Sequence, residues 1–424
     1  MLNINRICIY IIMFGLILLV PSIVFVTFVD ELCAMALLGT ALADCIFNRT
    51  WRRYSLLWGI VAVITFYAIY SLTTKAYNIP AYIFMDLLIE VKPFIPFAVI
   101  LVLRPEMTSE DRRIIKRICV ANSVITTIVF LCGPQVMKFM FVNPSFASQV
   151  LFVSAIYYLY CSIDRDTGKV PRTSLRTALL MLTIGLASLK AKYYGYYIIG
   201  LYLLTFYKPG SFRHIRFKHM VGVGLLGLVI LAATWSKIEY YFLTGSGTDF
   251  DPEIIETFAR PVLYATGGLI LMDHIPFGSG LASFATATSS MNYSGLYHEY
   301  GIDKVHGISQ NSEYSFICDS FYPSLAQFGF VGVVLFIWFW VYVYGYLRVM
   351  IRHDAALYKY KFIIGSLIIA FILIESVAAT TFTHNSGFLV MFLLGMVCAD
   401  GRVIKRDSVA DTLPRKSVAA LRKI

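Results

Sequence analysis

The sequence predicts an all-α polytopic membrane protein of about twelve transmembrane helices, with one large extramembrane loop that contains short helices. Three observations lead to this fold class. Hydrophobic residues make up 58% of the 424 residues, charged residues make up 14%, and the mean hydropathy is +0.71, which is typical of integral membrane proteins. Apolar runs long enough to cross about 30 Å of hydrocarbon recur along the chain. Lys and Arg are concentrated in a few short segments between those runs.

Twelve apolar stretches are predicted to span the membrane, because a spanning helix needs roughly 20 apolar residues. The second and the last are short, which also fits tilted or re-entrant segments. The first has no small-residue cleavage site behind it, so we expect a retained helix rather than a signal peptide. The predicted spans are residues 7–29, 31–46, 55–73, 80–103, 117–135, 149–163, 177–191, 193–207, 220–236, 325–347, 362–380 and 385–399.

Basic residues predict the orientation, because cytoplasmic loops retain Lys and Arg. Five loop segments and the two termini hold 28 of the 36 Lys and Arg residues and fall on one side of the predicted helices. We therefore place both termini in the cytoplasm. Topology and anionic lipid explain the net charge of +11, so no nucleic-acid partner is expected. The five segments are NRTWRR, RPEMTSEDRRIIKR, DRDTGKVPRTSLR, KPGSFRHIRFKH and LRVMIRHDAALYKYK.

One long loop, residues 237–324, is predicted on the outer side between the ninth and tenth spans. It separates nine helices in residues 1–236 from three helices in residues 325–399, and residues 400–424 form a cytoplasmic tail. Within the loop, DPEIIETF carries helix-start signals, and Pro261 is expected to end that helix and begin another, PVLYATGGLILM, which packs against the membrane domain. Turn-rich DHIPFGSG follows, and then irregular structure with short helices.

Neither a metal nor another cofactor is predicted. All cysteines except Cys318 lie in or beside apolar runs, where cysteine behaves as a small hydrophobic residue. No disulfide framework or metal-ligand spacing follows from their positions. The segment FGSGLASF looks like a glycine-rich phosphate loop, but it follows no predicted strand, so a turn is the better interpretation.

Arg260 is the sharpest candidate in the loop, which holds ten acidic residues against Lys237, Arg260 and Lys304. It precedes the amino end of a predicted helix, where free N–H groups favour an anion, and its guanidinium binds phosphate through two donors. The alternative is a structural salt bridge to an acidic residue on the preceding turns, Glu253 or Glu256.

Lys190 and Lys192 lie between two short apolar runs at the predicted outer face, within ASLKAKYYGYYIIG. Lysines at that place oppose the positive-inside tendency, so they are candidates for binding a lipid-linked phosphate. The alternative is that both side chains extend to the headgroups beside a belt of tyrosines.

Asp319 stands at the junction of the loop and the tenth span, where a general base is one reason for a carboxylate. A helix cap is the alternative, because Asp at a cap and Pro at a helix start are both common. Glu90, Lys92 and Glu375 lie within predicted spans and are expected to pair inside the bundle.

The whole chain resembles the O-antigen polymerase/ligase family of bacterial inner-membrane glycosyltransferases, and its polymerase branch most closely. The resemblance lies in the many-span layout with one late periplasmic loop, and in the order of ARPVLY…MDHIPFGSGLASF, LKAKYYG and DSFYPSLAQFGFVG. It implies a GT-C-like helical fold, a metal-independent reaction and an active site on the periplasmic face. It also implies undecaprenyl-diphosphate-linked glycans as donor and acceptor, and a chain-length regulator in the same membrane as a possible partner.

On this resemblance, Arg260, Lys190 and Lys192 would stabilise the negative charge on the diphosphate, while Asp319 or a neighbour deprotonates the acceptor hydroxyl. The loop tyrosines would line the sugar groove; they are Tyr293, Tyr297, Tyr300 and Tyr314.

Two other functions stay open. A ligase would transfer the glycan to lipid A core, but ligases carry a His–Asn type pair where this chain has Cys318 and Asp319. A lipid-linked oligosaccharide flippase also suits twelve spans, although carriers commonly show repeated halves and no internal repeat is visible here.

Overall fold

A computed structural model describes residues 4–25, 28–74, 77–208, 259–312 and 314–411, and every regular element in those ranges is helical. Four of the described helices are long and apolar enough to cross a membrane, and a bent pair would make a fifth. The described part of the chain is therefore all-helical and has the apolar helices of a membrane protein, as predicted. The candidate spans are Trp51–Thr73, Ser109–Cys132, Tyr322–His353 and Asn385–Asp407, with Pro134–Phe141 and Pro144–Cys161 as the bent pair.

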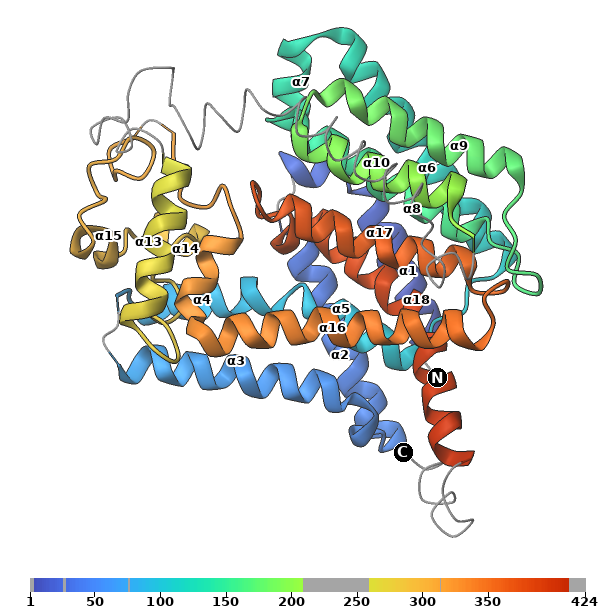
Figure 1. Cartoon of the computed structure of the whole chain (residues 1–424), viewed down its shortest axis with the longest axis horizontal. Coiled ribbons are helices and arrows are strands. Elements are labelled where there is room, and N and C mark those ends of the chain that lie inside the picture. The colour runs from blue at the N-terminus through green and yellow to red at the C-terminus, as the bar shows by residue number, and fades with distance from the viewer. Residues whose placement is uncertain (1–3, 26–27, 75–76, 209–258, 313, 412–424) are drawn as a thin grey trace, which may run out of the picture.

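The elements follow one another as short and long helices (Figure 1). In chain order they are α1 (Ile4–Ile17), η1 (Pro21–Ile23), α2 (Val29–Asn48), η2 (Trp51–Tyr54), α3 (Ser55–Thr73), α4 (Pro80–Val91), α5 (Phe94–Leu103), α6 (Ser109–Cys132), α7 (Pro134–Phe141), α8 (Pro144–Cys161), α9 (Arg172–Ile184), η3 (Gly185–Ser188), α10 (Ala191–Phe206), α13 (Ala259–Asp273), α14 (Ala287–Met291), α15 (Gly295–Glu299), η6 (Tyr322–Phe328), α16 (Gly329–His353), α17 (Lys359–Glu375), η7 (Thr381–Thr383) and α18 (Asn385–Asp411).

Several predicted spans are not single helices, two of them with a proline at the break, and the count of twelve spans stays a prediction. The first, 7–29, stops at Ile17 and is followed by η1, which starts at Pro21. The fourth, 80–103, divides into α4 and α5 at Pro93. In both places proline cannot donate a backbone hydrogen bond, which favours a break. The predicted span 220–236 lies outside the described residues.

The helices α8 and α18 form the centre of the molecule. Fifteen residues of α8 are buried. In the most apolar part of α18, 78% of the residues are buried. The helix α18 packs against α5, α16 and α17, and α8 packs against α6 and α9. Helices that are apolar on all sides are expected in the interior of a bundle, so both positions follow from the sequence.

The described part of the long loop forms a small unit with its own core. The side chains of Leu263 and Ile270 from α13, Phe284, Tyr297 and Ile308 are almost completely buried together. Figure 1 shows α13, α14 and α15 gathered at one end of α3 and α16. The predicted helix PVLYATGGLILM and the short helices that follow are confirmed, whereas the predicted helix DPEIIETF lies outside the described residues. The described part of α13 already includes Ala259 and Arg260, so the prediction that this helix begins at Pro261, with Arg260 before its amino end, is wrong.

A glycine-rich segment, residues 277–284, ties this unit to the membrane helices. The N–H of Leu281 donates to Ser71 Oγ of α3 at 2.7 Å, and the N–H of Ala282 donates to the carboxylate of Asp86 of α4 at 2.8 Å. Gly278 has a φ of +81° and approaches Gly329 so closely that a Cβ on Gly278 would lie 2.3 Å from the Gly329 nitrogen. The sequence therefore needs glycine at this crossing. The interpretation of FGSGLASF as turn structure is confirmed.

Three of the basic loops meet on one side of the molecule, around a cavity of about 570 Å³ to which Arg104, Arg165 and Lys361 contribute. Asp400 of α18 forms ion pairs with both Arg104 and Lys361 there. A fourth basic loop is joined to α18 because Arg402 donates to the carbonyl of Arg53 at 2.6 Å. These loops share a side as predicted, and the assignment of that side to the cytoplasm stays a prediction.

Candidate functional site

A polar cavity of about 280 Å³ lies between the membrane helices and the loop unit. The amino end of α2, the carboxyl end of α4 and the segment 380–386 line it from the membrane side. Residues 285–287, Cys318, Phe321 and Ser324 line it from the loop side. Titratable side chains from separate parts of the chain meet here; they are Asp30, Glu31, Glu90, Lys92, Cys318 and His384.

Lys92, the cation that lines this cavity, is already neutralised by two carboxylates. Its Nζ lies 2.6 Å from Asp30 Oδ2 and 2.5 Å from Glu31 Oε1. The expected pairing of Lys92 inside the bundle is confirmed. With Glu90 also present, acidic side chains outnumber the one described ammonium group that lines the cavity, so the cavity suits sugar hydroxyls better than a diphosphate.

His384 stands at the end of η7 and faces the cavity. Its Nε2 lies 3.2 Å from Thr380 Oγ1, and its ring meets the ring of Phe146 edge-on. His384 is solvent-exposed, and the protein packed around its ring still reduces its hydration. This desolvation, and then the positive charge of Lys92, lowers the pKa of His384 to about 4. The imidazole is therefore neutral at neutral pH and can accept a proton.

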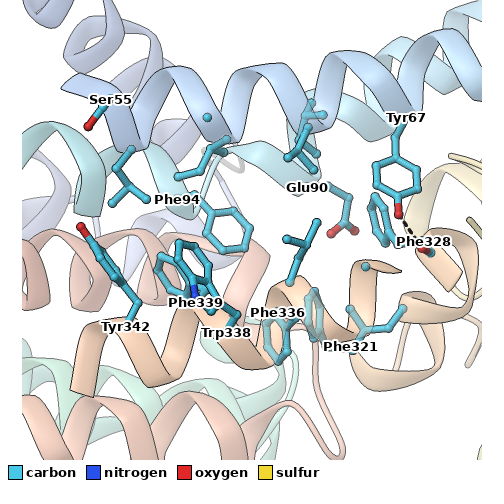
Figure 2. Close-up of a pocket in the computed structure, with 18 residues that line it drawn as sticks. Ser55, Tyr67, Glu90, Phe94, Phe321, Phe328, Phe336, Trp338, Phe339 and Tyr342 are labelled. Atoms are coloured by element: carbon cyan, nitrogen blue, oxygen red, sulfur yellow. Dashed lines mark hydrogen bonds between the residues drawn. The ribbon is translucent and has the colours of Figure 1, made fainter. Parts of the chain in front are cut away.

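An apolar groove of about 420 Å³ runs between α3 and α16 and reaches the same region. Figure 2 shows the carboxylate of Glu90 directed into it among the rings of Phe94, Phe321 and Phe336. Glu90 and Phe321 line both the groove and the polar cavity. An apolar channel and a polar chamber therefore meet at these two residues.

Arg260 and Asp319 form an ion pair with each other, although 59 positions separate them in the sequence. Neither Arg260 nor Asp319 is among the described residues that line the cavity, although Asp319 directly follows Cys318, which lines it. The helix-cap alternative for Asp319 is wrong, because η6 begins at Tyr322 with Phe321 in the cap position. The alternative partners of Arg260, Glu253 and Glu256, lie outside the described residues.

Lys192 is bound inside the helix bundle, which separates it from Lys190. Its Nζ lies 2.7 Å from Glu375 Oε2 and donates to the carbonyl of Ala378 at 3.1 Å. The same carboxylate accepts hydrogen bonds from Gln149, Tyr196 and Thr381. The expected pairing of Glu375 is confirmed, and it reduces the charge that Lys192 can offer to a diphosphate. Lys190 occupies the cap position of α10.

Lys192 and the helix that carries Arg260 both bind the segment that leads to His384. One helical turn beyond Arg260, the hydroxyl of Tyr264 donates to the carbonyl of Val377 at 2.8 Å, and Lys192 binds the next carbonyl, that of Ala378. Six residues later the chain reaches His384 at the cavity. Hydrogen bonds therefore join α13 and Lys192 to the segment that leads to His384.

The four tyrosines have different positions, and none of them is among the described residues that line the cavity. Tyr297 is completely buried, and its hydroxyl accepts from the N–H of Ala285. A groove-lining role for Tyr297 is therefore wrong, because its ring fills the core of the loop unit. Tyr300 donates to Asp273, whereas Tyr314 is 65% exposed. Tyr293 packs on Tyr297 with ring centroids 5.0 Å apart.

Comparisons with protein-family models and with curated proteins find no match for this chain. The family resemblance therefore stays a prediction from the sequence. His384, Asp30 and Glu31 were missed as site residues by sequence reasoning. The available signal was polar TTFTHN between two apolar runs, and DE at the start of another.

Proposed function

We propose that this protein is a membrane glycosyltransferase that polymerises lipid-linked surface polysaccharide. It transfers a growing glycan from undecaprenyl diphosphate to the non-reducing end of an undecaprenyl-diphosphate-linked repeat unit, on the periplasmic face of the bacterial inner membrane. The observation that carries the proposal is the junction of the apolar groove and the polar cavity at Glu90 and Phe321. A lipid-linked sugar needs both environments side by side.

The distribution of charge supports separate binding places for the diphosphate, the sugar hydroxyls and the hydrocarbon carrier of the substrate. Arg260, which pairs with Asp319 next to the cavity-lining Cys318, binds the diphosphate, and Lys190 is the second candidate ligand. The acidic cavity holds acceptor hydroxyls. The aromatic groove between α3 and α16 accommodates the hydrocarbon carrier, because burial of apolar surface favours such contact.

The transfer forms one bond and breaks another. The acceptor oxygen attacks the anomeric carbon of the donor sugar, and the bond to the diphosphate oxygen breaks with its electron pair. Arg260 stabilises the charge that collects on the diphosphate. The acceptor proton passes to a base, for which Asp319 and His384 are the two candidates, since His384 lines the cavity and Asp319 follows the cavity-lining Cys318.

A defined lipid-linked repeat unit tests this function. Purified protein is incubated with an undecaprenyl-diphosphate repeat unit, without nucleotide sugar or metal, and the products are separated by size. We expect a ladder of longer glycans. Glycan transfer only when lipid A core is added would indicate a ligase. No transfer to either acceptor, with movement of the substrate across a vesicle membrane, would indicate a flippase and refute the proposal.

A further inference from the structure

A second groove, unrelated to the polar cavity, lies on the outer surface of α6 and α8 and has a volume of about 580 Å³. One turn of α6 near its amino end contributes three cations to the groove, Arg113, Lys116 and Arg117. Apolar side chains follow on the next two turns, and Tyr158 of α8 closes one side. Its complete lining is Arg113, Lys116, Arg117, Val120, Ala121, Val124, Ile125 and Tyr158, none of which is acidic.

The positive charge of this groove is not neutralised within the described part of the chain. The nearby carboxylate of Asp111 binds Arg6 at 2.8 Å and closes the capping box with Thr108. The described residues provide no ion pair for Arg113, Lys116 or Arg117. Lys116 Nζ lies 6.0 Å from the ring centroid of Tyr158, which holds the ammonium group over the groove. The groove therefore selects an anion.

The position of the groove on α6 indicates what kind of anion. The helix α6 is a candidate membrane span, and its apolar residues Val124 and Ile125 remain 51% and 41% exposed. The cations stand at the end of α6 that carries a predicted cytoplasmic loop, where headgroups lie. An anion at the headgroup level with an apolar chain directly below it is a phospholipid.

We propose that this groove binds one anionic phospholipid of the surrounding bilayer. The phosphate contacts Arg113 and Arg117, while Lys116 approaches it from the side of Tyr158. One acyl chain lies along Val120 and Val124. The apolar contact distinguishes a lipid from free phosphate, which would use the cations alone. This site lies on other helices than the glycan cavity, and lipid binding there needs no glycan chemistry.

Native mass spectrometry of the full-length protein in zwitterionic detergent tests the site. Phosphatidylglycerol is titrated against phosphatidylcholine, and the bound lipid is counted. We expect the wild-type protein to retain one phosphatidylglycerol, and Arg113→Gln/Arg117→Gln to bind it about tenfold to thirtyfold more weakly, because each surface cation contributes to the attraction. The matched control is Arg172→Gln/Arg176→Gln in α9, which removes two exposed arginines at the same predicted side.

Two further measurements distinguish a bound phospholipid from free phosphate, and they do not depend on the fold of the double arginine variant. Inorganic phosphate at the concentration of the lipid should not displace phosphatidylglycerol, and Val124→Ser should weaken lipid binding with all three cations present. Equal retention of the two lipids by wild-type protein would overturn the proposal. Equal weakening in the α9 control, or displacement by inorganic phosphate, would also overturn it.

Discussion

The pair formed by Lys192 and Glu375 gives the sharpest test of how the cations are used. The side chain of Glu375 is inaccessible to solvent and that of Lys192 is 12% exposed, with 2.7 Å between Nζ and Oε2. Lys192→Met keeps the length of the side chain but leaves a buried carboxylate without its cation. Removing one partner of a buried pair costs about 3–5 kcal/mol of unfolding free energy. Glu375→Gln should cost a similar amount, because it leaves the ammonium group uncompensated.

The double variant distinguishes an ion pair from two independent contributions. Lys192→Met/Glu375→Gln has no buried charge, and the glutamine can still bond Gln149, Tyr196 and Thr381. We therefore expect it to be more stable than the sum of the single effects predicts, by about 2 kcal/mol or more. The assay is denaturant unfolding in mixed micelles, with exposed Lys138→Met as the control, expected within about 0.5 kcal/mol of wild type.

Strict additivity of the single variants, or single variants as stable as wild type, would refute the pairing argument. The same variants also report on function. If Lys192 binds the diphosphate, the double variant regains stability but still makes no glycan ladder. If Lys192 only supports the segment that leads to His384, stability and activity return together.

Four other predictions follow from the site and the topology. Arg260→Lys should lower glycan-ladder formation about tenfold or more at normal expression, since lysine keeps the charge but loses the two-donor geometry; an unchanged ladder would limit Arg260 to holding Asp319. Asp319→Asn should abolish chain growth, whereas full-length polymer from this variant would assign the base to His384. The pKa of His384 falls from 6.5 to about 4, so the unfolded chain binds the proton first on acidification. The stability that this neutral histidine contributes is then complete above pH 6.5 and is lost as pH falls toward about 4. The free energies of unfolding of wild type and His384→Gln should therefore differ in their pH dependence within that window. Coincident pH profiles would contradict the assignment. In a cysteine-free protein, an impermeant thiol reagent should label Ser290→Cys from outside and Asp166→Cys only after the membrane is breached; the reverse pattern would invert the topology.

The sequence predicted those parts of the fold that depend on local pattern. The predicted span 55–73 coincides with α3, because its apolar run is uninterrupted between two turns. The division of 80–103 at Pro93 was not predicted, because the residues on both sides of Lys92 and Pro93 form one apolar run. The partners of Lys92 were not predicted either, because they come from α2 and local periodicity contains no information about them.

The candidate site was predicted in part, for the same reason. Arg260 and Asp319 were identified separately from their surroundings in the sequence, but their ion pair depends on the packing of α13 beside η6. Tyr297 was placed in a groove because aromatic residues in a loop suggest sugar binding, whereas the loop unit has a core that needs its ring. His384 lies in the short connection between α17 and α18. It reaches the cavity because η7 packs near the ends of α2 and α4, which the sequence alone does not show.

The crossing of Gly278 and Gly329 limits how substrate reaches the cavity. A unit that covers a chamber can act as a lid only if one of its edges lifts. Along this edge, Gly278 and Gly329 touch backbone to backbone, and the hydroxyl of Tyr70 and the N–H of Val331 add bonds to Gly278 and Pro276. Lifting it would break these contacts together, with no side chain able to rotate and absorb the motion. The unit is thus fixed to α3 and α16 along this edge, so under the proposed function the groove between those helices is the route for the lipid-linked substrate.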